Sequence, residues 1–550
     1  MQKRTIPSSL VRCVAVETPP PSLQDNRADA DRLKQALAAQ FRQEGVGAPL
    51  AIPLAQLARV AARFRAAGFR GCALVNILPA LSEIVDFLPE EPPMLPGLAL
   101  DLGTTHLEAT LLDLRTGAVL AAGQCVNRQI RYGADILSRI HHARQGSPSG
   151  EADTGGTGLA QLQAEVLDSI NDLARELASR AGCAAGDIRA VSVSGNTTMV
   201  HLLLGLSPYH LCREPYIPLV NAPDPCHGAE LGLAVFPFAP VWIMPSIGSY
   251  FGGDLISGIL ATGLDQGEAI SMLIDVGTNA EVVLGNRDWL IACAGAAGPA
   301  LEGGVARMGM RAGPGAVEHV TIDRTSWRLA CTTIDQSPAA GICGSGLIDL
   351  VAELYLAGIV DFRGKLRRPA KAASADQREF LRQRLVSDDQ GTQFIVVPAE
   401  ETVHGLAVSL TQTDLDALMR SKAAMYAILT TLAAQVGVAF AGLARIFVAG
   451  AFGRHIDPRQ AITLGMLPDL PLATYQSVGN TSLRGAELVL LSGDCRRRSM
   501  EIHSKITYLE LNVNQEFMLR FSAARFIPHA DPALFPSVPQ YHGDFEGKAA

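Results

Sequence analysis

The arrangement of apolar and polar positions along the chain changes near residue 97. Before it, the strand-like VRCVAVE is followed by two segments of helical period, NRADADRLKQALAAQF and PLAQLARVAARFRAAGF, and then by two strand-like runs, CALVNI and EIVDFLP. We expect Asn26 to cap the first helix and a proline to open the second. The proline-rich EEPPMLPG closes this stretch, so residues 1–96 are predicted to form a small α+β domain and a junction.

From residue 97 onward, short apolar runs alternate with longer segments of helical period, which is typical of α/β layers. Two stretches interrupt this pattern, at residues 144–158 and 363–377. They are small, polar or basic, and we predict that they are exposed surface loops. The pattern predicts a large α/β region over residues 97–530 and a short C-terminal tail over residues 531–550.

One apolar segment, residues 423–444, carries no charged residue and is long enough to resemble a membrane span. It contains Thr430 and Gln435, it has a polar start at Thr413 and Asp414, and a strand-like RIFVAG follows it. We therefore predict a buried core helix and no membrane-spanning segment.

The composition narrows the function classes. A chain of 550 residues is too long for a single hydrophobic core. Its net charge of −8 argues against a nucleic-acid binder, which would carry a basic excess. No two of its ten cysteines are closer than twelve positions, so there is no cluster spacing for iron and sulfur. With no signal peptide, this scatter predicts reduced thiols and a cytoplasmic protein.

Two strand–turn–strand segments carry the same acidic glycine turn: LALDLGTTHLEATLLD, residues 98–113, and SMLIDVGTNAEVVLG, residues 271–285. Glycine lets the backbone approach an anion, and the N–H groups and hydroxyls of such a turn donate to phosphate oxygens. An aspartate that closes the strand would repel a bare phosphate, but it suits an intervening Mg²⁺. The candidate residues are Asp101, Gly103, Thr104 and Thr105 in the first turn, and Asp275, Gly277, Thr278 and Asn279 in the second.

Three further glycine turns follow apolar runs. RIFVAGAFGRHI, residues 445–456, ends a strand in a pair of glycines, where adenosine could lie flat against the backbone. AVSVSGNTTMVHLLLG, residues 190–205, is either a phosphate turn or a simple helix cap. GICGSGLIDLVAELYLAG, residues 341–358, could contact phosphate or ribose at its helix start. The candidates are Gly450, Ala451 and Gly453, then Gly195, Asn196 and Thr197, then Gly344, Ser345 and Gly346.

This order of turns and helices resembles the ATPase superfamily of actin, sugar kinases and heat-shock chaperones. The resemblance implies an α/β fold with two ribonuclease-H-like lobes, about residues 97–270 and 271–530, that grip one Mg²⁺–ATP. Asp101 and Asp275 would then be the catalytic acidic residues, bound to the metal through its waters. The two acidic turns would hold phosphates, and Gly450, Ala451 and Gly453 would line the adenosine.

A more detailed resemblance is to the reductive activators of corrinoid-dependent enzymes. It is carried by NRQIRYGADILSRI, SGNTTMVHLLLG, IDVGTNAEVVLG, AGAAGPALEGG, GICGSGLIDL, VAGAFG and ITYLELNVNQEFMLRFSAARFIPH, and by the segment at residues 16–37. The resemblance implies ATP-dependent reduction of cob(II)alamin to cob(I)alamin in a partner corrinoid protein or cobalamin-dependent methyltransferase. It also suggests a homodimer.

The chain departs from that family in one respect. The family usually receives its electrons through an N-terminal [2Fe–2S] domain with four cysteine ligands, and only about ten residues precede VRCVAV here. We therefore expect no iron–sulfur cluster in this chain and a separate ferredoxin-like donor.

Two alternatives remain at this point. A small-molecule kinase of the same fold would use Asp254, in SYFGGDLISGIL, as the base that deprotonates a hydroxyl, although Asp254 could equally be a helix cap. A nucleotide-dependent, chaperone-like scaffold would bind ATP and change its affinity for a partner. Two other features have plain interpretations: Cys343 is expected to be a packed small residue, and CRRRSM, residues 495–500, an exposed basic patch.

Overall fold

The computed structural model describes residues 9–44, 48–146, 156–277, 279–295, 306–367, 374–388, 391–511 and 515–539. Contacts group the chain into two compact units. The first contains Met1–Ala261 and Thr481–Lys505, and the second contains Thr262–Asn480 and Ile506–Ala550. We call the large α/β part of each unit the first lobe and the second lobe.

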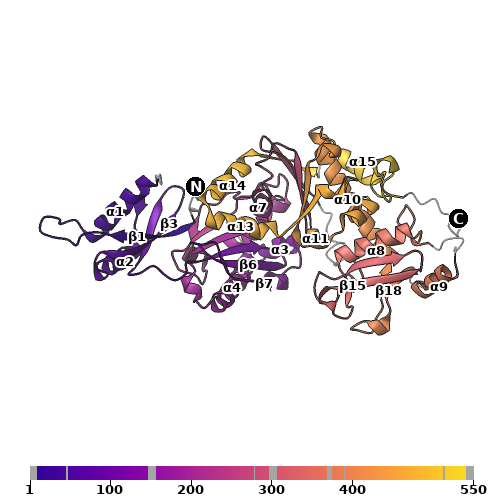
Figure 1. Cartoon of the computed structure of the whole chain (residues 1–550), viewed down its shortest axis with the longest axis horizontal. Coiled ribbons are helices and arrows are strands. Elements are labelled where there is room, and N and C mark those ends of the chain that lie inside the picture. The colour runs from indigo at the N-terminus through magenta and orange to yellow at the C-terminus, as the bar shows by residue number, and fades with distance from the viewer. Residues whose placement is uncertain are drawn as a thin grey trace. The chain divides into compact units, whose positions relative to one another are not determined.

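The N-terminal domain is a four-stranded sheet with two helices on it (Figure 1). Its core contains Phe41, Phe64 and Phe87, which are all buried. The sheet has the order β1-β3-β4-β2, as the pattern of strands and helices predicted. The elements are β1 (Val11–Glu17), α1 (Asp29–Gln43), β2 (Leu50–Ala51), α2 (Leu54–Ala66), β3 (Arg70–Ile77) and β4 (Ser82–Leu88).

Asn26 does not cap helix α1, so that prediction was wrong. The helix begins at Asp29, and the residue before it, Ala28, offers no side-chain cap. The preceding turn is organised by Asp25, whose carboxylate accepts hydrogen bonds from Arg27 Nε at 2.8 Å and from Arg32 Nη1 at 2.5 Å. These arginine bonds fix residues 25–27 in an irregular segment, and the helix starts only at Asp29.

Polar contacts join the N-terminal domain to the first lobe. The fully buried carboxylate of Asp86 lies 2.7 Å from Arg63 Nη1 in its own domain and 3.4 Å from Arg189 Nη1 in the lobe. Glu83 Oε2 lies 2.8 Å from His227 Nε2. This hydrogen bond raises the pKa of His227 and lowers the pKa of Glu83.

The first lobe is built on a six-stranded sheet of order β7-β6-β5-β8-β10-β9. β5 to β7 form an antiparallel meander, and β8 and β10 extend the sheet in parallel on the other side of β5. This is the predicted ribonuclease-H-like arrangement. The strands are β5 (Pro96–Leu102), β6 (His106–Asp113), β7 (Val119–Val126), β8 (Ala190–Gly195), β9 (Cys226–His227) and β10 (Pro240–Ile243).

The second lobe repeats this topology in a sheet of order β21-β20-β11-β12-β13-β22. β11 to β13 form the antiparallel meander, and β20 and β21 follow in parallel on the other side of β11. The two lobes therefore share five strands in the same order, whereas the sixth strand joins the parallel side as β9 in the first lobe and the meander side as β22 in the second. The strands are β11 (Ser271–Val276), β12 (Ala280–Gly285), β13 (Leu290–Gly295), β20 (Arg445–Ala449), β21 (Tyr475–Gly479) and β22 (Ile506–Tyr508).

The second lobe also carries two small antiparallel or mixed sheets, of orders β15-β14-β16 and β17-β18-β19, with α8 packed on β14 (Figure 1). Their strands are β14 (Ala316–Asp323), β15 (Arg328–Thr333), β16 (Gly341–Ile342), β17 (Leu385–Asp388), β18 (Gly391–Val397) and β19 (Val408–Thr411). The helices of this lobe are α8 (Gly344–Leu356), α9 (Ala375–Arg384), α10 (Gln412–Gln435), α11 (Gly450–His455), α12 (Pro458–Leu464) and α15 (Gln515–Ala523).

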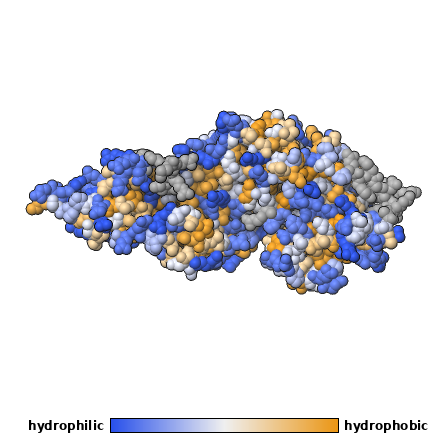
Figure 2. All heavy atoms as spheres, viewed as in Figure 1, coloured by the Kyte–Doolittle hydropathy of each residue, from blue (hydrophilic) through white to orange (hydrophobic). Residues whose placement is uncertain are grey.

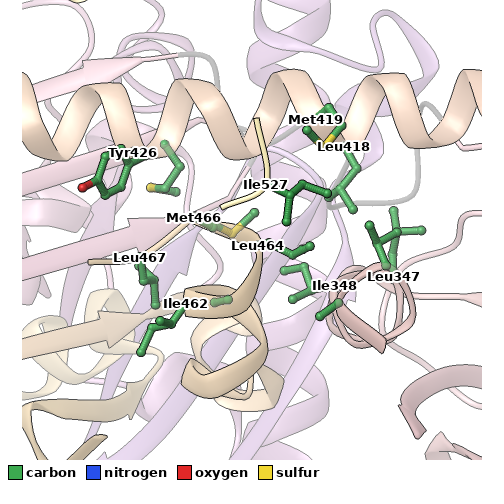
Figure 3. Close-up of a cluster of buried hydrophobic side chains, with 14 of the residues drawn as sticks. Leu347, Ile348, Leu418, Met419, Tyr426, Ile462, Leu464, Met466, Leu467 and Ile527 are labelled. Atoms are coloured by element: carbon green, nitrogen blue, oxygen red, sulfur yellow. The ribbon is translucent and has the colours of Figure 1, made fainter. Parts of the chain in front are cut away.

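Of the uncharged segment at residues 423–444, the part up to Gln435 lies in helix α10, which is largely buried as predicted. The prediction was wrong for residues 436–444, which follow the end of the helix and are mostly exposed. The cap of α10 is Thr411, which forms a capping box with Asp414, so the helix starts slightly earlier than Thr413. Figure 3 shows side chains of α10 packed with those of α8 and α12 in the core of this lobe. The visible surface mixes polar and apolar residues (Figure 2). Among the described residues, no helix has the length and hydropathy needed to cross a membrane.

The chain returns to the first unit after β21. Helices α13 (Thr481–Leu491) and α14 (Gly493–Lys505), which the sequence placed in the second lobe, are grouped with the first unit by their contacts. α13 packs on β5 and β8. It also crosses α7 so closely that a Cβ added to Gly485 would lie 2.3 Å from Ser257 Cβ. The first unit's other helices are α3 (Ile136–Ala143), α4 (Thr157–Arg180), α5 (Thr197–Leu204), α6 (Gly228–Leu231) and α7 (Gly253–Thr262).

Candidate functional site: two acidic glycine turns

Asp101 is the penultimate residue of β5, the first strand of its sheet in chain order. It pairs with Glu108 on the antiparallel neighbour β6 and with Ser194 on the parallel neighbour β8. β8 then ends at Gly195. The Asp101 carboxylate therefore lies at the edge of the sheet where the hairpin turn from β5 to β6 and the turn from β8 to the following helix lie next to each other.

Asp275 occupies the equivalent position in the second lobe. It is the penultimate residue of β11, and it pairs with Glu281 on β12 and with Ala449 on β20. Gly450 follows directly after β20. Each lobe thus places one aspartate at the same position of its sheet, beside a glycine at the end of the neighbouring parallel strand, β8 or β20.

In the second lobe, the glycine beside the aspartate has a conformation that other residues rarely adopt. Gly450 has φ of 79°, and a Cβ added there would lie 2.7 Å from Asp275 Oδ1. Gly277 N donates to Asn279 O over 2.9 Å. The structure therefore brings Asp275, Gly277, Asn279 and Gly450 together, while Thr278 lies outside the described residues.

The adenosine candidates Gly450, Ala451 and Gly453 all lie in the short helix α11 that follows β20. A Cβ added to Gly453 would lie 2.5 Å from Val448 O, so only glycine allows this helix to start so close to its strand. The glycine at position 453 therefore serves local packing.

In the first lobe, the carbonyl oxygens of the turn are all occupied by donors of the protein. Gly103 O accepts from Asn127 Nδ2 at 3.0 Å, and Thr104 O accepts from Arg139 Nη2 at 2.6 Å. Thr105 O accepts from Asn127 N at 2.8 Å. Since carbonyl oxygens would repel a phosphate, their engagement with these donors favours an anion at the turn.

Arg139 is the fully buried centre of this support. It also donates to Gly133 O over 2.9 Å and to Gln129 Oε1 over 3.1 Å, and burial lowers its pKa to about 10. Asn127, Gln129, Gly133 and Arg139 all belong to the NRQIRYGADILSRI segment. The sequence analysis used that segment only for its family resemblance and missed this supporting role, because the burial of Arg139 shows only in the folded structure.

Asn196 performs two tasks at the end of β8. Its side-chain oxygen accepts from Met199 N at 2.9 Å, which confirms the helix-cap interpretation, and its Nδ2 donates to Thr104 Oγ1 over 3.1 Å. Thr197 Oγ1 donates to Gly248 O over 2.9 Å. The Gly195–Asn196–Thr197 turn is therefore joined to the first acidic turn through Asn196.

Ser482, the second residue of helix α13, was not identified from the sequence. Its Oγ donates to Asp101 Oδ1 over 2.6 Å. The residues are far apart in the chain, so no local pattern could have shown the contact.

Models of one family match the chain in three successive parts. These are the RACo linker region over residues 2–90, the RACo middle region over residues 96–267, and the C-terminal domain of RACo, the ASKHA domain, over residues 269–539.

A corrinoid activation enzyme, RamQ of Eubacterium limosum, is 30% identical over 450 residues, which cover 82% of this chain and 73% of the relative. The solved structure of a reductive activator for corrinoid, iron–sulfur protein is 36% identical, with a TM-score of 0.85, and the match covers 98% of this chain and 82% of that one. The chain belongs to the family of corrinoid reductive activators.

A third relative of this activator is the [Co(II) methylated amine-specific corrinoid protein] reductase of Methanosarcina barkeri, which is 23% identical over 447 residues. That match covers 75% of this chain and 73% of the relative. The named relatives and the ASKHA fold agree with the predicted ATP-hydrolysing activator.

The third glycine turn of the activator, Gly344–Ser345–Gly346, is buried at the start of α8. Ser345 Oγ donates to Glu318 O over 3.1 Å, and a Cβ added to Gly346 would lie 2.2 Å from Val317 O. Cys343 is buried there as predicted, with its Sγ 3.3 Å from Val317 O. These contacts explain the residue types of the turn by packing on β14.

Two histidine–carboxylate pairs lie beside this helix. His319 Nδ1 is 3.0 Å from Asp349 Oδ2, and His455 Nδ1 is 3.3 Å from Glu318 Oε2. Burial raises the pKa of Asp349 to about 6. In the part of the chain that the structure describes, no group of three or more His, Cys, Asp or Glu side chains could hold a metal ion.

Asp254 is the second residue of α7, and its Oδ1 accepts from Leu255 N at 2.9 Å. A Cβ added to the nearby Gly252 would lie 2.5 Å from Asn196 Cα, so this turn packs against the end of β8. Asp254 therefore lies inside the first turn of its helix and does not occupy the cap position that the sequence suggested as the alternative.

The predicted basic patch at residues 495–500 was wrong for Arg496. That side chain is buried in α14 and donates to Val489 O over 2.7 Å. Arg497 is exposed, but it lies 3.3 Å from Asp494 Oδ1 and 3.3 Å from Glu501 Oε1. The positive charge is therefore partly buried and partly neutralised along the same helix.

Proposed function

We propose that this activator binds Mg²⁺–ATP at its two acidic turns and uses ATP turnover to drive the reduction of cob(II)alamin to cob(I)alamin in a partner corrinoid protein. The observation that supports the ATP site is the duplicated position of the aspartates: Asp101 and Asp275 lie at the same place in two sheets that share five strands in the same order. The corrinoid role is supported by the names of the relatives.

The residues present fit a magnesium–nucleotide. Gly103 and Gly450 leave no room for a Cβ, and the carbonyl oxygens of the first turn already accept hydrogen bonds. Asp101 and Asp275 would hold the metal through its waters, and bound Mg²⁺ would neutralise the phosphate charge. The proposed phosphate contacts are Gly103, Thr104, Thr105, Gly195, Asn196, Thr197, Gly277, Thr278 and Asn279, and the proposed adenosine and ribose contacts are Gly344, Ser345, Gly346, Gly450, Ala451 and Gly453.

The energetic logic follows from the reaction. One electron passes from a reduced donor to cob(II)alamin, and this unfavourable step needs an external source of free energy. ATP can supply it only if the complex has two conformations that bind the nucleotide with different affinities. In this proposal, the contacts of the two turns with the nucleotide determine which of the two conformations the complex adopts.

We propose a separate iron–sulfur protein as the electron donor because the ten cysteines lie too far apart in sequence for a cluster motif. The homodimer and the cytoplasmic location stay predictions from the sequence.

An anaerobic assay tests the proposal. The protein, ATP, a reduced ferredoxin and a corrinoid protein loaded with cob(II)alamin are mixed, and the corrinoid spectrum is followed. Formation of cob(I)alamin should require ATP and should be lost in Asp101→Asn and Asp275→Asn. Reduction at the same rate without ATP would contradict the proposal. A phosphorylated small molecule would support the kinase alternative, and ATP binding without any reduction would support the scaffold alternative.

A further inference from the structure

Helix α13 completes the first acidic turn from a distant part of the chain. Ser482 Oγ donates to Asp101 Oδ1 over 2.6 Å, although 381 residues separate the two. The Ser482 side chain is buried, so water competes little for this bond. A hydrogen bond that a buried hydroxyl donates to a carboxylate is shorter and stronger than one between neutral groups.

Two more serine hydroxyls are linked to Ser482 by hydrogen bonds and form a series with it. Ser194 Oγ lies 2.9 Å from Ser482 Oγ, and Ser257 Oγ lies 2.8 Å from Ser194 Oγ. Both residues are fully buried. The four side chains come from β5, α13, β8 and α7, so the series ties four elements of the first unit together.

The single proton of the Ser482 hydroxyl has two acceptors. Ser482 Oγ donates to Asp101 Oδ1 and also to Ser194 Oγ, and ionised Asp101 can only accept. The contact with the carboxylate is the shorter of the two, 2.6 Å against 2.9 Å, so the proton lies mainly toward Asp101. Between Ser194 and Ser257, either hydroxyl can donate.

We propose that Ser482 is a positioning residue that fixes the carboxylate of Asp101 for Mg²⁺-dependent nucleotide binding, with Ser194 and Ser257 as successively weaker supports. The proposal rests on the proposed function, because it takes Asp101 as an anchor of the metal. The bond from Ser482 restricts rotation of the carboxylate and favours its ionised form. Both effects prepare Asp101 to accept hydrogen bonds from metal-bound water.

Ser192 provides a matched control. It lies on the same strand as Ser194, it is fully buried, and its Oγ donates to Ala486 O of α13 over 2.7 Å. It therefore ties the same helix to the same sheet without belonging to the series that ends at Asp101. If ATP affinity fell only because the packing of α13 on the sheet was weakened, it would fall similarly in Ser192→Ala and Ser482→Ala. If it fell because the carboxylate of Asp101 was no longer held in place, it would fall only in Ser482→Ala.

The experiment is calorimetric titration of the full chain with ATP, once in excess Mg²⁺ and once in EDTA. The quantity of interest is the ratio of the two affinities, which measures the contribution of the metal. We expect Ser482→Ala to lower this ratio about tenfold and Ser194→Ala about threefold. Ser192→Ala should keep the wild-type ratio, and Ser482→Thr, which retains a hydroxyl, should restore most of it.

The outcomes separate this proposal from the proposed function. If Asp101→Asn lowers the ratio but Ser482→Ala behaves like Ser192→Ala, the positioning role of Ser482 is overturned and the role of Asp101 stands. If wild-type protein shows no Mg²⁺-dependent ATP binding, the proposed function itself fails. If Ser482→Ala does not fold, the comparison of Ser194→Ala with Ser192→Ala decides, and equal ratios overturn the proposal.

Discussion

The two lobes place an aspartate in the same slot but hold it by different means. In the first lobe, Asp101 accepts a hydrogen bond from a hydroxyl of α13, and the adjoining turn is fixed by Asn127 and Arg139. In the second lobe, Asp275 lies against Gly450, whose left-handed conformation leaves no space for a side chain. Strand order therefore fixes the position of the aspartate in each lobe, and each lobe supports it with different residues from distant parts of the chain.

The largest effect is expected from Gly450→Ala. Alanine at φ of 79° costs about 1–2 kcal/mol in conformational energy, and its Cβ would lie 2.7 Å from Asp275 Oδ1. We expect ATP binding, measured by calorimetry, to be abolished because the carboxylate must move. Gly437→Ala is the control, since Gly437 also has positive φ, 65°, but open space around it. Equal ATP affinity in both variants would show that Asp275 is not fixed by this glycine.

The corresponding change in the first lobe is Arg139→Met. It removes the buried donor to Thr104 O and Gly133 O and leaves those acceptors unpaired. We expect the free energy of unfolding to fall by about 3–4 kcal/mol and ATP affinity to fall as well. Denaturant titration and calorimetry measure the two effects. Arg128→Met, at an exposed Arg that pairs with Asp172, should change stability by less than about 1 kcal/mol. A similar loss in both variants would contradict the special role of Arg139.

A third prediction concerns pH and the second lobe. The pKa of Asp349 is raised to about 6, above its unfolded value, so the folded state binds this proton more tightly. Its contribution to stability is full below about pH 4 and is lost as pH rises through about 6. Between pH 4 and 7, wild type should lose about 2–3 kcal/mol relative to Asp349→Asn, measured by denaturant unfolding. If the free energy of unfolding changed with pH in the same way in both proteins, a contribution of Asp349 to this pH dependence would be excluded.

The smallest effect is expected at the joint between the N-terminal domain and the first lobe. The pKa of His227 is raised and that of Glu83 is lowered by their mutual hydrogen bond. The pair therefore stabilises the joint between about pH 4.5 and 6.5, and this is lost as pH rises through the folded pKa of His227. We expect the pair to contribute less than about 1 kcal/mol to the stability of the joint. Its loss should be seen as faster proteolysis of the joint at pH 8 than at pH 6. His227→Gln should remove this difference in rate, and a difference that persists in the variant would assign it to other groups.

The duplicated acidic turns could be predicted from sequence because each is local. A strand, an aspartate and a glycine lie within a few residues of one another, so their pattern is visible without the fold. Asp101 and Asp275 accordingly occupy equivalent positions. The buried helix α10 was likewise predictable from the polar residues within its apolar segment and from its capped start.

The supports of the turns could not be predicted because they are not local. Ser482 reaches Asp101 only after the intervening strands and helices have folded, and Arg139 binds a carbonyl 35 residues earlier. Asn26 failed as a cap because the neighbouring Asp25 binds two arginines. Arg496 failed as a surface charge because periodicity alone does not show which face of α14 is covered.

The return of α13 to the first unit also has a consequence during biosynthesis. The ribosome makes Ser482 only after adding 381 residues beyond Asp101, which takes about 20–80 s at ordinary elongation rates. Until then the emerging chain can form the strand that bears Asp101 but not the hydroxyl contact that steadies it. A nascent chain would therefore bind cellular nucleotide weakly, and full nucleotide binding would develop only near the completion of translation.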